Sequence, residues 1–179
     1  AGARIVRVQG TITISGMVPV SSNKSILGVG SNAVVTGGGL NISEASNINI
    51  RNIRSQGSDD DGINIQESSH HIWIDHCDFT NHFDGALDIK RASDFITVSW
   101  NHFFNQDKNM LLGHSDDNGA QDRGHLRVTY HHNWFDGTNQ RNPRTRFGNP
   151  VHVFNNYYLN VGDYGLASTM ESGVRAENN

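Results

Sequence analysis

The chain has 179 residues, with 14 Lys and Arg against 18 Asp and Glu, and a formal net charge of -4. This length suits one domain, and the acidic balance disfavours a general nucleic-acid binder. No run of 18 apolar residues is present that could span a membrane, and the single cysteine, Cys77, cannot form an internal disulfide. Glycine is abundant and proline rare among alternating Val and Ile, which predicts many short strands joined by turns.

The chain carries an internal repeat. The pattern apolar-x-apolar-x-x-Asn, or a close variant of it, starts at positions 48, 72, 96, 128, 151 and 174, so most starts are 23 or 24 residues apart and one interval is 32. A second series, Ile63, Leu87 and Leu111, is also spaced by 24 residues. Because a single short strand cannot bury its apolar face, we expect the repeats to stack on one another. Stacking would place one set of amide side chains in a hydrogen-bonded ladder inside a turn: Asn101, Asn133, Asn156 and Asn179.

These features predict an all-β fold, a right-handed parallel β-helix, over residues 1–179 as a single domain. Leucine is too sparse for leucine-rich repeats, and the period is too short for propeller blades. We expect an insertion within residues 115–122, inside the long interval, and no long helix. Most of the ten histidines recur at corresponding turn positions, so we expect them to be structural rather than catalytic or zinc-binding.

Carboxylates gather on neighbouring repeats. Asp84 and Asp88 are four residues apart, and we expect both to lie on one strand and to share its outward face with Lys90. The run 59–61, all Asp, lies one repeat earlier, and Asp107-Lys108 lies one repeat later. Crowded carboxylates without clustered His or Cys favour calcium over zinc. The alternative is that the Asp run forms an ordinary solvated turn.

A basic segment follows at residues 140–148, where Arg141 and Arg146 flank a turn fixed by Pro143. Arginines beside a cation site suit a polymer that carries carboxylates. His114, Ser115 and Asp116 do not predict a hydrolytic triad, because adjacent residues cannot adopt that geometry.

Four blocks together resemble the signature segments of polysaccharide lyase family 1, the pectate lyases, in the order found in that family. They are Trp73-Ile74-Asp75-His76, residues 84–90, Asp107-Lys108 with residues 113–116, and residues 141–148. The resemblance implies a secreted right-handed parallel β-helix that uses Ca²⁺ to cleave polygalacturonate by β-elimination. The expected products are 4,5-unsaturated oligogalacturonates.

The resemblance also implies roles for single residues. Asp84 and Asp88 resemble calcium ligands, and the third ligand comes from the upstream Asp run. Asp61 matches best if the turn near residues 68–69 carries one inserted residue, whereas the 24-residue spacing points to Asp60; Asp61 is preferred, and Asp59 could assist. Arg141 resembles the catalytic base, and Lys108 and Arg146, with Lys90 beside the acidic patch, are expected to bind substrate. Arg144 is expected to be structural and paired with a carboxylate.

The chain departs from the family in length, since family members usually add an N-terminal helical cap and further C-terminal coils. We therefore expect a partial or trimmed catalytic domain. Two other functions stay open: a pectin lyase, which would lack the calcium carboxylates, and a non-catalytic β-helix that binds polysaccharide or acts as a scaffold. The expected partner is polygalacturonate, with no nucleic acid and no membrane, and the chain is expected to be a monomer.

Overall fold

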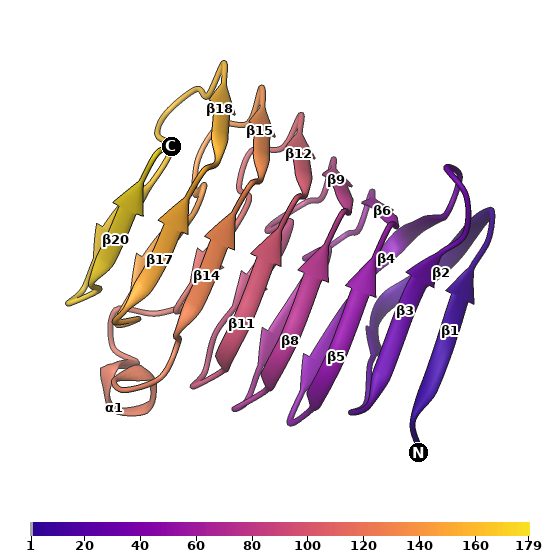
Figure 1. Ribbon diagram of the computed structural model, residues 1–179, viewed down its shortest axis with the longest axis horizontal. Coiled ribbons are helices and arrows are strands. Elements are labelled where there is room, and N and C mark those ends of the chain that lie inside the picture. Colours follow the sequence, from indigo (N-terminus) through magenta and orange to yellow (C-terminus); the bar gives the residue numbers. More distant parts are fainter. Residues whose placement is uncertain (1) are drawn as a thin grey trace.

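The computed structural model describes residues 2–179, in which short strands wind into a parallel coil with the two ends of the chain at opposite ends of the stack (Figure 1). Eight strands form one continuous parallel sheet, called the first sheet here. They are β1 (Arg4–Val8), β3 (Lys24–Gly28), β5 (Ser46–Arg51), β8 (His70–Asp75), β11 (Asp94–Ser99), β14 (Val128–His131), β17 (Val151–Phe154) and β20 (Val174–Glu177). The parallel β-helix predicted from the repeat is confirmed.

The remaining strands form two further rows. The second row holds β6 (Arg54–Gln56), β9 (Asp78–Thr80), β12 (His102–Phe104), β15 (Trp134–Asp136) and β18 (Tyr157–Leu159). The third row holds β7 (Ile63–Gln66), β10 (Leu87–Ile89), β13 (Leu111–Leu112), β16 (Arg144–Arg146) and β19 (Ala167–Thr169). At the N-terminal end the long strand β4 (Val34–Ser43) pairs with both β6 and β7, and β2 (Thr11–Pro19) pairs with β4.

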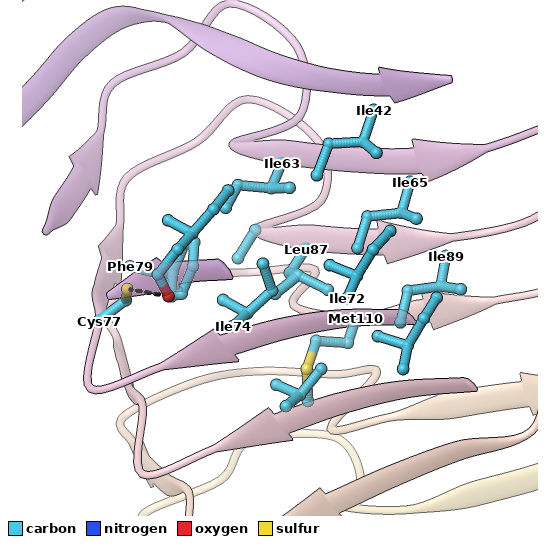
Figure 2. Packing of buried hydrophobic residues seen from close by; sticks show 14 of the residues in the cluster. Ile42, Ile63, Ile65, Ile72, Ile74, Cys77, Phe79, Leu87, Ile89 and Met110 are labelled. Atoms are coloured by element: carbon cyan, nitrogen blue, oxygen red, sulfur yellow. Dashed lines mark hydrogen bonds between the residues drawn. The ribbon is translucent and has the colours of Figure 1, made fainter. Parts of the chain in front are cut away.

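Alternation along each strand directs one set of side chains into the coil. Ile72 and Ile74 of β8 pair in register with Ile48 and Ile50 and with Ile96 and Val98, and all six are buried. Figure 2 shows this interior, in which isoleucines from stacked strands pack on one another. In the second row the rings of Phe79, Phe103 and Phe135 stack at centroid distances of 4.9 and 5.3 Å. Removing the middle ring, by Phe103→Ala, would cost about 3–5 kcal/mol.

The predicted amide ladder is also confirmed, at the turn between the first sheet and the second row. The Nδ2 group of Asn101 donates to Oδ1 of Asn133 at 3.0 Å, Asn133 donates to Asn156 at 3.0 Å, and Asn156 donates to Asn179 at 2.8 Å. The residue before each of the first three asparagines lies in the left-handed region, with φ between 53° and 54°. The sharp corner and the ladder thus recur together in each coil.

The long interval contains an insertion, as expected. Ile96 pairs directly with Val128, so the extra residues loop out of the stack between β13 and β14. They include α1 (Gly119–Asp122), and no helix in residues 2–179 is long and apolar enough to cross a membrane. The Asp122 carboxylate is buried and accepts the backbone N–H of Ala92 at 2.8 Å, which ties the insertion to the coil.

The second repeat series is only partly correct. Ile63 pairs with Leu87, but Leu112 rather than Leu111 lies opposite Ile89. The register therefore changes from 24 to 23 residues between β10 and β13, and Leu111 lies beside Asp88 instead of Leu87. This shift places the backbone N–H of Leu111 within 3.0 Å of the Asp88 carboxylate.

Candidate active site

The candidate site lies at the turns that lead from the second row into the third. Consecutive coils bring their backbones together there through parallel bridges that join Gly85 to Lys108 and Lys108 to Gln140. Residues that are far apart in the sequence thus become neighbours at strand spacing, roughly 4.8 Å. Six of the seven residues singled out in the sequence, all but Arg146, lie near one another at this corner.

Two buried carboxylates, those of Asp61 and Asp88, lie on either side of Gly85. Oδ1 of Asp61 accepts the Gly85 N–H at 2.9 Å, and the two residues are only 3 % and 4 % exposed. A Cβ atom at Gly85 would approach Asp88 Oδ1 to 2.4 Å and Asp61 Oδ1 to 2.9 Å, so this position requires glycine. Close approach of the backbone is what lets the two carboxylates face each other.

Burial and mutual repulsion shift the titration of this pair. Burial, with the neighbouring Asp61 carboxylate, raises the pKa of Asp88 to about 8. Burial also raises the pKa of Asp61, although Lys90 and the Gly85 N–H oppose the change. The Lys90 Nζ lies 3.7 Å from Asp61 Oδ2, so one ammonium group faces two carboxylates. The pair consequently carries an excess of negative charge whenever both members are ionised.

Asp84 connects this pair to the basic residues. Its Oδ1 lies 3.0 Å from Lys108 Nζ and 4.0 Å from Arg141 Nη1. The Asp84 carboxylate is also close enough to Asp61 to contribute to the raised pKa of Asp61. The site therefore runs without interruption from the buried carboxylates to the guanidinium of Arg141.

Two details of the predicted acidic patch are wrong. Asp84 is not on a strand with Asp88, because β10 begins at Leu87 and Asp84 belongs to the preceding turn. Asp88 alternates with the inward-facing Leu87 and Ile89, yet it is buried rather than open to solvent. The turn at Gly85, in the same coil, and the backbone of Leu111, in the next coil, close over the carboxylate.

The upstream Asp run divides sharply. Asp59 and Asp60 are exposed, whereas Asp61 is buried against Gly85. The choice of Asp61 does not require an inserted residue near positions 68–69, because β7 pairs with β10 in an unbroken 24-residue register. That register aligns Asp61 with Gly85, and the Asp61 side chain reaches Asp88 past the missing Cβ.

The arginines differ in their surroundings. Arg141 has φ near 59° and precedes a cis peptide to Pro143, and its buried Nε has no hydrogen-bond partner among residues 2–179. Arg146 is almost fully buried; its Nε donates to Asp116 at 2.5 Å and its Nη1 donates to the Gly113 carbonyl at 2.9 Å. Arg144 forms no ion pair in the described part of the chain, so its expected carboxylate partner is absent.

Sequence reasoning missed three buried side-chain amides at this corner. Asn109 donates through Nδ2 to Oδ1 of Asn142, which forms a second, shorter amide ladder under Arg141. Gln106 donates to the backbone carbonyls of Asp84 and Lys108. Repetition of amides at the turn would have been a signal for the first pair, but Gln106 has no equivalent in adjacent repeats.

The donors present suit a hard cation. Asp61, Asp84 and Asp88 supply carboxylate oxygens, and neither His nor Cys is among them, which favours calcium. In residues 2–179, however, no three His, Cys, Asp or Glu side chains are already arranged to hold a metal ion. Asp84 instead pairs with Lys108. The chain thus supplies the right ligand types while leaving the set unassembled.

Comparison with known proteins identifies the family. The pectate lyase family profile matches residues 13–179. The chain belongs to the pectate lyase family. It is 45% identical to a pectate trisaccharide-lyase from Thermotoga maritima and 40% identical to a probable pectate lyase A from Aspergillus flavus, and the alignments cover 94% and 99% of this chain.

A solved pectate lyase from Bacillus sp. N165, in complex with trigalacturonate, superposes with a TM-score of 0.92 at 34% identity over 99% of this chain. This chain spans about half the length of the curated pectate lyases it matches, 52% and 58% for the two named above, and 61% of the Bacillus structure. Family membership and the β-helix are therefore established over nearly the whole chain.

Proposed function

We propose that this chain is the catalytic portion of a pectate lyase that cleaves α-1,4-polygalacturonate by calcium-dependent β-elimination. The single observation that carries the proposal is the corner where Asp84, beside the buried carboxylates, contacts Lys108 and Arg141 from consecutive coils. A polyanionic sugar needs both a cation site and fixed positive side chains. The trigalacturonate in the related Bacillus structure is consistent with such a substrate.

We assign the metal ligands to Asp61, Asp84 and Asp88. When bound, calcium would neutralise a uronate carboxylate and hold it against the enzyme. The buried pair provides two oxygen ligands at a fixed place, and Asp84 supplies the third from the turn. Binding would replace the Asp84–Lys108 contact, which frees the Lys108 ammonium for the substrate.

Arg141 acts as the base. In β-elimination it takes the proton from C5, the carbon next to the uronate carboxylate. The electron pair of the C–H bond forms the double bond between C4 and C5, the C4–O bond breaks, and the leaving oxygen takes up a proton. The product is a 4,5-unsaturated oligogalacturonate. A guanidinium is an unusual base because it normally stays protonated at neutral pH. The buried Nε of Arg141 has no hydrogen-bond partner among residues 2–179, which leaves this group available and supports the assignment.

Three further cations bind the substrate carboxylates in this proposal. Lys108 stands beside Asp84, and Lys90 stands beside Asp61. Arg146 uses Nε and Nη1 for Asp116 and Gly113, which leaves Nη2 for a substrate oxygen. These fixed charges stabilise the charge that develops on the carboxylate as the proton leaves.

The proposed enzyme is secreted, monomeric and built as one β-helix unit over residues 1–179. The test is to incubate the chain with polygalacturonate in calcium and in excess chelator, and to follow the ultraviolet absorbance of the unsaturated product. Calcium-dependent absorbance is expected. Absorbance only with methyl-esterified polymer, regardless of chelator, would indicate a pectin lyase, and binding without product would indicate a non-catalytic β-helix.

A further inference from the structure

A buried glutamine lies directly beneath the turns that carry Asp84 and Lys108. Gln106 is only 3 % exposed, and its side chain is fully engaged with the backbone. Its Nε2 donates to the carbonyls of Asp84 at 2.8 Å and Lys108 at 3.0 Å, and it also contacts the carbonyl of His82 at 3.1 Å. Its Oε1 accepts the His82 N–H at 2.7 Å.

These bonds connect two coils. His82 and Asp84 belong to the turn before β10, whereas Lys108 belongs to the turn before β13. One amide group therefore fixes the backbone of Asp84 relative to that of Lys108. The side chains of the same two residues form the 3.0 Å ion pair on the surface above.

The equivalent positions in the two adjacent coils, His82 and Thr138, make no such link. One coil earlier, the His82 ring accepts the Ser58 N–H and contacts the Ser55 carbonyl, so it bonds only towards the preceding coil. One coil later, the buried hydroxyl of Thr138 has no hydrogen-bond partner in residues 2–179. Of these three equivalent positions, only Gln106 carries a side chain that donates to backbone carbonyls of its own turn and of the preceding turn.

We propose that Gln106 is a positioning residue for the pectate lyase reaction, which holds Asp84 and Lys108 at the separation that calcium and substrate binding require. This inference rests on the proposed function. Gln106 touches no reacting group, so its loss should act through the placement of Asp84 and Lys108 and leave Arg141 in position.

Two substitutions test this. Gln106→Glu keeps the length and the acceptor for His82 but removes the amide donors. Gln106→Met keeps the length, removes the donors and adds no charge. For both we expect the calcium concentration at half-maximal activity and the KM for polygalacturonate to rise about tenfold, while kcat at saturating calcium and substrate changes little.

The matched control is Asn156→Asp, at the opposite turn. Asn156 is a buried amide that donates to Asn179 Oδ1 at 2.8 Å and to the Tyr130 carbonyl at 3.1 Å, and the substitution also removes donors while keeping an acceptor. We expect it to lower the melting temperature without changing KM or the calcium requirement. If Gln106→Met does no more than this control, Gln106 is merely structural and the inference is wrong. If only Gln106→Glu has an effect, the cause is the added charge, which overturns it as well.

A crystal structure of Gln106→Met separates this inference from the proposed function. We expect the backbone bridge between Gly85 and Lys108 to open and the Asp84–Lys108 ion pair to be lost. If both are retained, the inference is wrong even where the wild-type chain is an active lyase. If the wild-type chain is inactive on polygalacturonate but the variant loses both contacts, the proposed function fails while the positioning by Gln106 stands.

Discussion

Substituting Asn133 by leucine should destabilise the coil measurably. Asn133 is 1 % exposed, and its Oδ1 accepts both the backbone N–H of Asn101, at 3.1 Å, and the Asn101 side-chain amide, at 3.0 Å. Leucine would leave the backbone N–H without its acceptor, whereas the side-chain amide keeps a bond to Ile74. The hydrogen bonds that Asn133 Nδ2 donates to the Val98 carbonyl and to Asn156 Oδ1 would also be lost.

One orphaned buried donor costs about 1–3 kcal/mol, and each weakened neutral hydrogen bond adds about 0.5–1.5 kcal/mol. We therefore expect Asn133→Leu to lower the free energy of unfolding by about 3 kcal/mol, a fall in melting temperature of roughly 6–12 °C for a chain of this size. Calorimetry and urea unfolding measure this directly. The control is Asn32→Leu, because Asn32 is exposed and its side chain forms no hydrogen bond in residues 2–179. Equal melting temperatures for the two variants would refute the ladder as a source of stability.

Three other predictions test the site and its support. Asp88→Asn mimics the protonated form that a pKa of about 8 favours, so the melting temperature should stay unchanged. The calcium concentration at half-maximal activity should rise about tenfold, because one ligand charge is lost. Full activity at limiting calcium would contradict the assignment. At saturating calcium, Arg141→Lys should lower kcat at least 10²-fold, roughly the contribution of general base catalysis. Arg144→Lys should keep a kcat near that of the wild type. The reverse result would mean that the base is misassigned. Burial lowers the pKa of His82 to about 4, so its contribution to stability is complete above pH 6.5 and should fall by on the order of 3 kcal/mol as the pH drops towards 4. In His82→Gln, the free energy of unfolding measured in urea should depend less steeply on pH in that window. An unchanged pH dependence would exclude His82 as the cause.

The first sheet could be predicted from the sequence because its pattern is strictly periodic. All six repeat starts, from Ile48 to Val174, lie in register, and the ladder asparagines bond as expected. The repeat series was recognised only from Ile48 onward, because Lys24 of β3 and Arg4 of β1 occupy the equivalent position and break the apolar-x-apolar pattern. Short third-row strands of two to four residues carry too little pattern to fix a register, and so the shift at Leu111 was missed.

The site was predicted in its residues more than in its geometry. Motif resemblance selected Asp61, Asp84, Asp88, Lys108 and Arg141, which do meet at one corner. Burial of Asp88 could not be predicted, because it depends on the neighbouring coil and on the absence of a side chain at Gly85. Alternation along one strand says which way a side chain points, but not whether another coil covers it.

Repulsion between carboxylates at this corner is unfavourable, and binding of a cation there would relieve it. Two buried carboxylates that lie together against Gly85, with Lys90 beside Asp61, are costly to ionise together. The hydrophobic stack below supplies the rigidity that keeps them close, because isoleucine and phenylalanine columns fix the spacing of successive coils. A hard cation that replaces the Asp84–Lys108 ion pair would neutralise the carboxylates and release Lys108 in the same step. Calcium binding and substrate binding should consequently be coupled at this corner, each increasing the affinity for the other.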